Sequence, residues 1–320
     1  MMFKKIWVKA TLALIFIFIL YINTDVTEVI GIVKHINFIY ILLAVLVVFL
    51  IRLLMSFRWK LILDENGMPI SFSESVYIIL VSGSVGFLSP GGVAADFLKG
   101  HHAYKKENNL SKVTMVVLFD KLIGIVSMFV LISLFSTILL LSSYQGDQEI
   151  LTVVSFVSCM MVIALFIGIA VLLKFEQNFK KLFGERLPKI KKVFNMVLNV
   201  FKEIALNKAL MSKVLILSLL MQLLRSLLFY FILRSLSIDI ALINVIAYFP
   251  IVFMLMLLPI TIGGVGVREG ATFILFNQFG VDLEYSISSG LLFYGVQLSM
   301  AVLGVIVYFL FSGKYSEQKS

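Results

Sequence analysis

Charged residues are scarce in this chain of 320 residues: they make up 14% of it, whereas apolar types make up 61%. A soluble domain of ordinary composition is about a quarter charged and about half apolar. The mean hydropathy is +1.06, and several apolar runs exceed the roughly 18 residues that indicate a membrane-spanning helix. The composition therefore argues against an ordinary soluble domain and predicts one all-α polytopic membrane domain over residues 1–320.

Cysteine and histidine are also rare, which limits the chemistry open to the chain. Cys159 is the only cysteine, so no disulfide can form within the chain. His101 and His102 stand in a basic loop without the additional ligands that a metal site requires. The sequence contains no evident nucleophile–base set and no nucleotide-binding loop. We therefore expect no metal, no cofactor and no enzymatic activity.

Positive charge is in excess, with a net charge of +9, but the basic residues lie in short segments beside apolar runs. This distribution is typical of cytoplasmic loops and of contact with anionic lipid headgroups, so nucleic acid is not an expected partner. The most basic segment, residues 174–213, has apolar residues at three- or four-residue steps between lysines. That pattern predicts an amphipathic helix on the cytoplasmic membrane surface, or alternatively a helix packed on the protein's own loops.

Six apolar segments are interpreted as complete membrane spans. They are residues 7–22, 36–57, 113–141, 150–173, 214–233 and 287–311. The first follows Lys4 and Lys5 but lacks a small-residue cleavage site, so we interpret it as an uncleaved helix. The positive-inside rule then places both termini in the cytoplasm of a prokaryotic cell, provided that two further apolar segments are hairpins rather than spans.

These two further segments are interrupted by helix breakers. In residues 76–98, which follow a helix start at Ser71 with Glu74 in capping-box spacing, the break is Ser89-Pro90-Gly91-Gly92. In residues 240–279 the break runs from Pro259 to Gly263-Gly264. Backbone freed at membrane depth is tolerated only where it is buried in protein or lines a wet cavity. Opposed broken segments, one entered from each side, indicate a transporter site between inverted repeats, although the halves share little beyond Gly-Gly-Val.

Charged residues follow both breaks. Arg268 and Glu269 form either a phosphate cradle at a new helix start or a structural ion pair. Asp96 and Lys99 share a helix face, so they can pair, either as an interfacial salt bridge or during substrate passage. Asp120 and Lys121 are adjacent and point apart, so we expect them to meet different partners, with Arg268 or Lys99 as a possible counter-ion.

Three other polar residues within the apolar runs receive ordinary interpretations. Arg52 is expected to snorkel along its own helix to the membrane interface. Gln222 and Arg225 are expected to form hydrogen bonds between helices.

These motifs resemble those of the flippase-like family typified by the membrane domain of lysylphosphatidylglycerol synthases. The resemblance covers almost the whole chain and rests on Ser89-Pro90-Gly91-Gly92 with Asp96 and Lys99, on Asp120-Lys121, and on Pro259 through Gly270. This chain has lysine at positions 99 and 121, where the family usually has arginine, so it lacks the planar fork that grips phosphate there. No stretch outside the spans is long enough for a soluble aminoacyl-transferase domain, so we do not expect lysyl transfer.

Together these features predict a protein that moves an anionic phospholipid or lipid-linked intermediate through a polar groove between the two breaks. The expected substrate-binding residues are Ser89, Pro90, Gly91, Gly92, Asp96, Lys99, Asp120, Lys121, Gly263, Gly264, Arg268 and Glu269. One alternative is an accessory scaffold subunit of a lipid-modifying or glycan-assembling enzyme, and a homo-oligomer is also considered. Another is a membrane-embedded transferase with Asp96, Asp120 or Glu269 as catalytic carboxylates.

Overall fold

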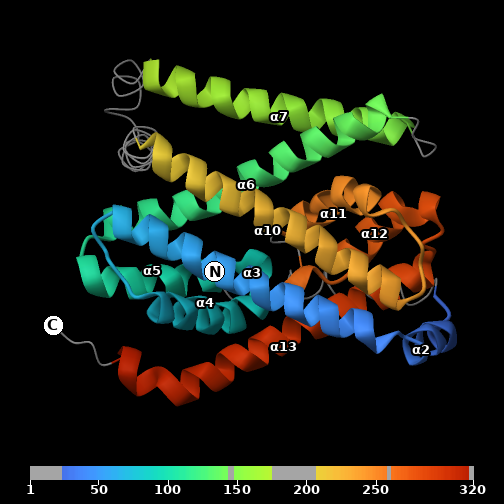
Figure 1. Cartoon of the computed structure of the whole chain (residues 1–320), viewed down its shortest axis with the longest axis horizontal. Coiled ribbons are helices and arrows are strands. Elements are labelled where there is room, and N and C mark those ends of the chain that lie inside the picture. The colour runs from blue at the N-terminus through green and yellow to red at the C-terminus, as the bar shows by residue number, and fades with distance from the viewer. Residues whose placement is uncertain (1–23, 143–147, 175–206, 258–260, 317–320) are drawn as a thin grey trace, which may run out of the picture.

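A computed structural model describes residues 24–142, 148–174, 207–257 and 261–316, and within these ranges the regular elements are all helical, as predicted (Figure 1). The α-helices are α2 (Val26–Lys34), α3 (Phe38–Glu65), α4 (Phe72–Phe87), α5 (Val93–Glu107), α6 (Leu110–Leu141), α7 (Gln148–Lys174), α10 (Lys208–Ser235), α11 (Leu242–Leu257), α12 (Val267–Phe276) and α13 (Leu283–Ser316). Three 3₁₀ turns join or extend them: η1 (Pro90–Gly92), η2 (Ile262–Gly264) and η3 (Asn277–Phe279).

Four of these helices are long and apolar enough to cross a membrane: α3, α6, α10 and α13 over Leu283–Gly313. They contain most or all of the predicted spans 36–57, 113–141, 214–233 and 287–311. The predicted span 150–173 falls within α7, whose segment Gln148–Ala164 is a shorter apolar helix. The predicted span 7–22 and most of the basic segment 174–213 lie outside the described residues.

Two local features differ from the prediction. Helix α3 continues to Glu65 rather than ending near residue 57, because Arg58 and Trp59 are buried in the protein and do not mark the interface. The predicted loop before it contains the short helix α2, which is capped by Asp25. The Thr27 hydroxyl and the amides of Thr27 and Glu28 donate to this carboxylate and lower the pKa of Asp25. The predicted cap at Ser71 is confirmed, since Glu74 N donates to its hydroxyl at 3.1 Å.

Both broken segments are helical hairpins. In the first, α4 and α5 run antiparallel, with Lys106 paired to Glu74 at the open end and Gly86 packed on Ala95 near the tip. In the second, Tyr248 of α11 packs against Phe276 of α12, with ring centroids 6.1 Å apart. Each tip holds two successive glycines at positive φ, 61° and 68° in η1 and 64° and 74° in η2. This left-handed backbone strains any residue with a Cβ, which explains the Gly-Gly pair in both halves.

The two halves of the described chain repeat the same order of elements: α3–α4–η1–α5–α6, then α10–α11–η2–α12–α13. Helices α3 and α10 correspond, have 28 residues each and lie side by side (Figure 1). They are antiparallel, because Asn37 N donates to Ser235 O at 2.9 Å at one end and the Asn207 amide donates to Glu65 at 3.1 Å at the other. Corresponding helices that run in opposite directions make the two halves an inverted repeat.

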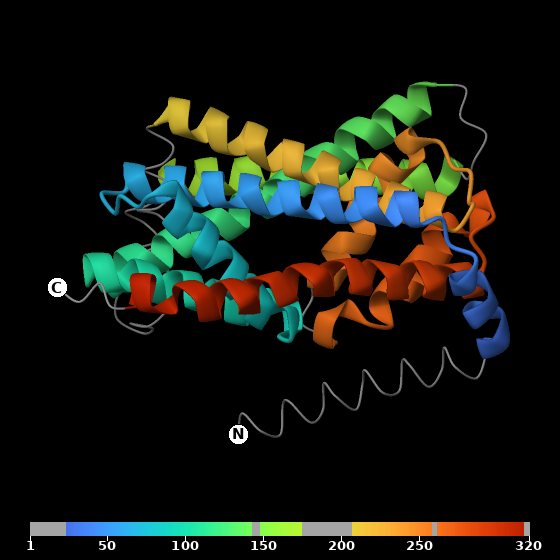
Figure 2. The ribbon, with the colours of Figure 1, turned by 60° about the horizontal axis from the view of Figure 1, so that its bottom comes forward.

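The helix ends support the same correspondence. Met68 N donates to Leu63 O after α3 at 2.9 Å, and Ile238 N donates to Leu233 O after α10 at 3.1 Å. Outside this pair, α13 packs along α4 and α11 packs along α6, which are equivalent contacts under exchange of the halves. Figure 2 shows α13 running along the length of the molecule beside the first hairpin. The tips η1 and η2 contact each other at the centre of this arrangement.

Candidate functional site

A cavity of about 320 Å³ lies between the two hairpin tips. Its wall brings together ten of the twelve residues predicted from the sequence: Ser89, Gly91, Gly92, Asp96, Lys99, Asp120, Lys121, Gly263, Gly264 and Arg268. Glu269 is paired to Arg268 but is not part of the wall. Segments about 170 residues apart in the sequence therefore meet at one site.

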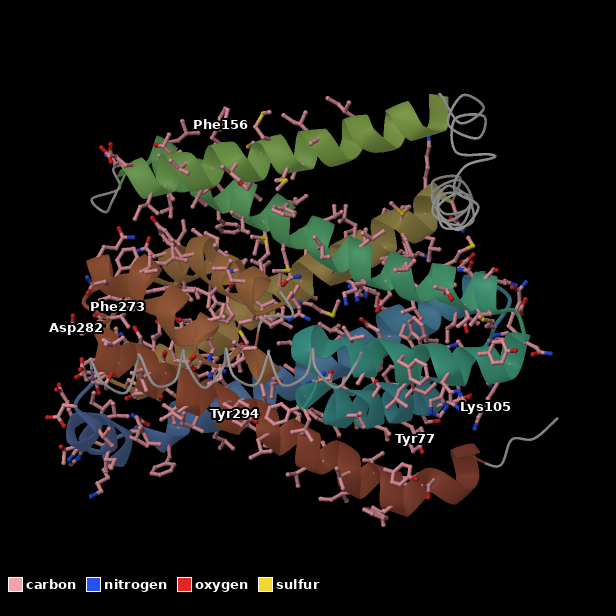
Figure 3. The ribbon with its side chains drawn as sticks, turned by 180° about the vertical axis from the view of Figure 1, so that it is seen from behind. Tyr77, Lys105, Phe156, Phe273, Asp282 and Tyr294 are labelled. Atoms are coloured by element: carbon pink, nitrogen blue, oxygen red, sulfur yellow. The ribbon has the colours of Figure 1, made fainter. Side chains whose placement is uncertain are left out.

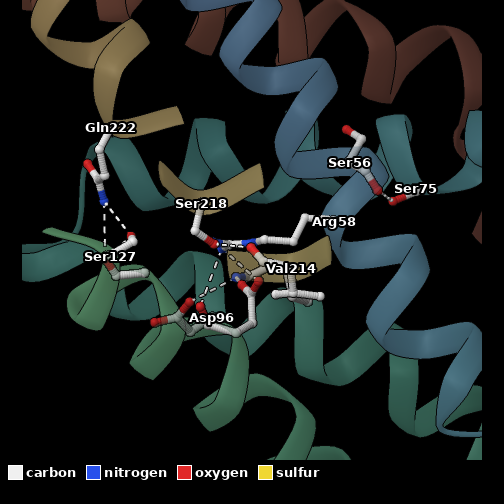
Figure 4. Close-up of polar contacts among 11 residues, drawn as sticks. Ser56, Arg58, Ser75, Asp96, Ser127, Val214, Ser218 and Gln222 are labelled. Atoms are coloured by element: carbon white, nitrogen blue, oxygen red, sulfur yellow. Dashed lines mark hydrogen bonds and ion pairs between the residues drawn. The ribbon is translucent and has the colours of Figure 1, made fainter. Parts of the chain in front are cut away.

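Five charged side chains form a continuous chain of ion pairs on one wall. Lys121 Nζ lies 2.9 Å and Lys99 Nζ 3.1 Å from the Asp96 carboxylate. Lys99 and Arg58 lie 2.9 and 2.7 Å from the Asp120 carboxylate. Arg58 also donates to the Ser218 hydroxyl at 2.7 Å (Figure 4). The pairing of Asp96 with Lys99 is confirmed, and Asp120 and Lys121 meet different partners, with Lys99 as the counter-ion of Asp120.

Arg268 and Glu269 form a separate ion pair at the start of α12. Both residues are buried, and the Arg268 guanidinium also lies over the Phe293 ring at 5.4 Å from its centroid. The other Glu269 carboxylate oxygen accepts the Gly266 amide at 2.6 Å, so it satisfies a free donor at the helix start. Gly290 of α13 faces this carboxylate, and a Cβ at that position would collide with it. The site therefore holds Arg268 in a fixed, neutralised position.

Two arginines that were not among the predicted substrate-binding residues, Arg52 and Arg225, also line the cavity. Arg52 of α3 donates to the Gln297 amide oxygen at 3.2 Å, so its expected role as a snorkelling interfacial residue is wrong. Arg225 of α10 donates to the Gln222 amide oxygen at 2.9 Å and stacks on Phe253 at 4.7 Å. Among the described residues, no carboxylate forms an ion pair with Arg52 or Arg225. A charged residue within a span is a functional candidate by default. By this criterion the sequence alone indicates Arg52 and Arg225 as candidate site residues.

Gln222 has the interhelical role that the sequence predicted. Its amide nitrogen donates to Gly124 O at 3.1 Å and to the Ser127 hydroxyl at 3.3 Å, both on α6 (Figure 4). The amide oxygen is thereby oriented toward Arg225. Within the described ranges no three His, Cys, Asp or Glu side chains gather in a way that could hold a metal ion.

The cavity wall as a whole is positively charged. Six basic side chains line it, namely Arg52, Arg58, Lys99, Lys121, Arg225 and Arg268, and two carboxylates, Asp96 and Asp120. Most of the remaining wall is apolar. A positive cavity with apolar walls attracts anions more strongly than the same charges would in water.

Span-length apolar helices surrounding a charged internal cavity define this chain as an integral membrane protein. The chain belongs to the lysylphosphatidylglycerol synthase transmembrane-region family, whose model matches residues 6–304. No individual curated protein sequence matches the chain. The family membership confirms the resemblance on which the sequence interpretation rested, and it associates the chain with membrane lipids.

Proposed function

We propose that this protein moves an anionic phospholipid or lipid-linked intermediate across the bilayer. The headgroup would pass through the cavity between the two hairpins while the acyl or prenyl chains stay in the lipid. The observation that supports this proposal is the meeting of two opposed hairpin tips at one cavity with an excess of positive charge. Hairpins that end at membrane depth on an internal site are the arrangement found in transporters built from inverted repeats.

The basic residues of the wall would share the work of neutralising the headgroup. Arg268 is preorganised by Glu269 and Phe293, and Gly263 and Gly264 of η2 line the same cavity. Lys99 is shared between two carboxylates, whereas Lys121 is more exposed and its one carboxylate partner among the described residues is Asp96. Lys121 therefore requires the least rearrangement to meet an incoming phosphate.

The distribution of charge favours one orientation in the membrane. Lys105 lies at one end of the molecule and Asp282 at the other, with Tyr294 between them (Figure 3). Lys106, Lys112 and Lys208 share the first end with the end of α13, and Asp239 and Glu284 lie at the second. From the positive-inside rule we propose that the first end, with the end of α13, faces the cytoplasm. The N-terminus is proposed to lie on the same side from the charges of its sequence alone.

One observation favours the alternative of a scaffold subunit: four of the six basic side chains in the wall already form ion pairs. Such pairs can serve stability alone. A scaffold would not move lipid when purified, whereas a transporter would, and a transferase would form product from a labelled lipid donor.

Reconstitution of the full chain into liposomes tests the proposal. We expect a fluorescent analogue of an anionic phospholipid, tested as both phosphatidylglycerol and phosphatidic acid, to become accessible to a membrane-impermeant quencher from both leaflets, faster than in protein-free vesicles. Lys121→Gln should slow this exchange by about tenfold, which corresponds to about 1.4 kcal/mol of lost stabilisation during passage. Lys112→Gln is the matched control on the same helix, because Lys112 pairs with Glu107 outside the cavity. Folded protein that exchanges no lipid under any gradient would contradict transport.

A further inference from the structure

Arg52 and Arg225 are the unusual charges of the cavity. They lie on the corresponding helices α3 and α10, and their hydrogen-bond partners in the structure, Gln297 and Gln222, are neutral. Arg225 is close enough to Arg58 and Arg52 to be repelled by both positive charges, and the weaker attraction of Asp120 offsets this only in part. A charged group at membrane depth normally pairs with an opposite charge. Among the residues that the structure describes, these two cations therefore lie in one cavity wall without an anion in an ion pair with either of them.

The charge balance of the whole site indicates what that anion must carry. The chain of ion pairs sets three cations, Arg58, Lys99 and Lys121, against two carboxylates, which leaves one positive charge. Arg268 and Glu269 balance each other. Together with Arg52 and Arg225, the site has three positive charges in excess. A single negative charge would leave two of them uncompensated at membrane depth, where an unpaired charge is energetically expensive.

Lipid headgroups differ in this respect. A phosphodiester such as that of phosphatidylglycerol carries one negative charge, whereas a phosphate monoester carries about 1.5 to 2 negative charges near pH 7, and a diphosphate at least as many. Arginine forks also match several phosphate oxygens at once. The cavity volume of about 320 Å³ is at the small end of ligand sites, so a compact headgroup fits it.

From this we infer that the cavity selects a phosphate monoester or diphosphate group over a phosphodiester, with Arg52 and Arg225 as its specificity-determining pair. That the group is carried on a lipid rests on the proposed transport function. The shared chemistry, a compact group of two or more negative charges, also describes a free phosphate ester. A binding measurement distinguishes a lipid-borne group from a free phosphate ester, and its result does not depend on whether the protein transports lipid.

Calorimetric titration of the purified full chain in detergent tests the selectivity. We expect short-chain phosphatidic acid to bind about tenfold or more tightly than short-chain phosphatidylglycerol, because charge-assisted contacts to the second charge are lost in the diester. Equal affinities would overturn the inference. Glycerol 3-phosphate, which has the same headgroup without chains, should bind more weakly than phosphatidic acid. Equal binding of both would uphold the selectivity for the headgroup while contradicting a lipid substrate.

Variants locate the selectivity. Arg52→Gln and Arg225→Gln should each reduce the preference for phosphatidic acid to about twofold, whereas Arg225→Lys, which retains the charge but loses the planar fork, should keep only part of it. Arg234→Gln is the matched control on α10, since Arg234 pairs with Asp239 at the helix end. A preference that survives both glutamine variants would contradict the assignment to this pair.

The pH dependence of wild-type binding provides a test that requires no variant. The second ionisation of a phosphate monoester lies near pH 6, and no histidine among the described residues lines the cavity. The charged groups that face the ligand are Arg52, Arg58, Lys99, Lys121, Arg225, Arg268, Asp96 and Asp120. We expect the affinity for phosphatidic acid to rise several-fold from pH 5 to pH 7.5 while that for phosphatidylglycerol stays constant. A parallel change for both lipids would place the titration on the protein and overturn the inference.

Discussion

At the scale of single residues, Asp120 is the centre of the ion pairs in the cavity wall. The residue is 4% exposed, and its carboxylate contacts both Lys99 and Arg58, which come from different helices. Replacing one member of a buried ion pair leaves the opposite charge uncompensated, and this costs more than the intact pair contributes. Asp120 is therefore the residue on which the electrostatic balance of α3, α5 and α6 depends.

We predict that Asp120→Asn lowers the free energy of unfolding by about 3–5 kcal/mol, the usual effect of breaking a buried ion pair. Thermal or denaturant unfolding in detergent measures this. Glu107→Gln is the matched control, because Glu107 pairs with Lys112 near the surface and such pairs contribute about 1 kcal/mol or less. A similar loss for both variants would show that burial of the pair is unimportant.

The residues of the cavity differ in how far the sequence predicted them. Asp96, Lys99, Asp120 and Lys121 stood out because they are charges beside helix breakers or within apolar runs, and the structure places all of them in the wall. Arg52 is the exception, because a span that ended near residue 57 would put this arginine within reach of the interface. The helix ends at Glu65, so Arg52 lies 13 residues, or about 20 Å, from that end.

At the scale of helices, the packing of α4 against α13 depends on the absence of a side chain. A Cβ on Gly304 would collide with the carbonyl oxygen of Leu80 and the hydroxyl of Ser84. The same Ser84 hydroxyl donates to Ala301 O at 2.7 Å, which joins the two helices directly. Small residues at such contacts allow backbones to approach closely in membrane proteins.

Gly304→Ala should therefore destabilise the protein by about 1–3 kcal/mol, as expected for overpacking between two rigid backbones. Gly295→Ala tests the same change on the same helix where no atom outside the helix lies within 4 Å of the new Cβ. It should be neutral or slightly stabilising, since alanine is the better helix former. Unfolding experiments on both variants in one detergent compare them, and equal stability would argue against close packing at Gly304.

The sequence predicted which segments are spans and which are hairpins better than it predicted which helices pack against each other. Apolar length identified α3, α6, α10 and α13, and the breakers identified the two hairpins. Which helices lie side by side could not be deduced, because lipid-facing and protein-facing positions are equally apolar and leave little periodic signal. The short helix α2, capped by Asp25, was not predicted, because it lies in the connection between two predicted spans.

At the scale of the whole molecule, the inverted repeat explains why two distant motifs form one site. The repeat was only a hypothesis from the sequence, because Gly-Gly-Val is a short match. The structure adds equal element order, antiparallel α3 and α10, and paired left-handed glycines in both tips. The charges do not follow this symmetry, since Asp96 and Arg268 each lie four residues after the second glycine of their tip. The two halves therefore share a fold, but their charged residues differ, and the cavity that they form together is basic.

The central claim is that the two hairpin tips enclose a wet, basic cavity within the membrane. Cysteine accessibility tests it most directly, in a Cys159→Ser background, with Met55→Cys in the cavity wall and Phe57→Cys on the outer face of the same helix. A thiol reacts only where water allows it to ionise. We predict that Met55→Cys reacts at least about tenfold faster than Phe57→Cys, and faster with an anionic than with a cationic methanethiosulfonate reagent. Equal protection of both positions, or faster reaction with the cationic reagent, would contradict the cavity.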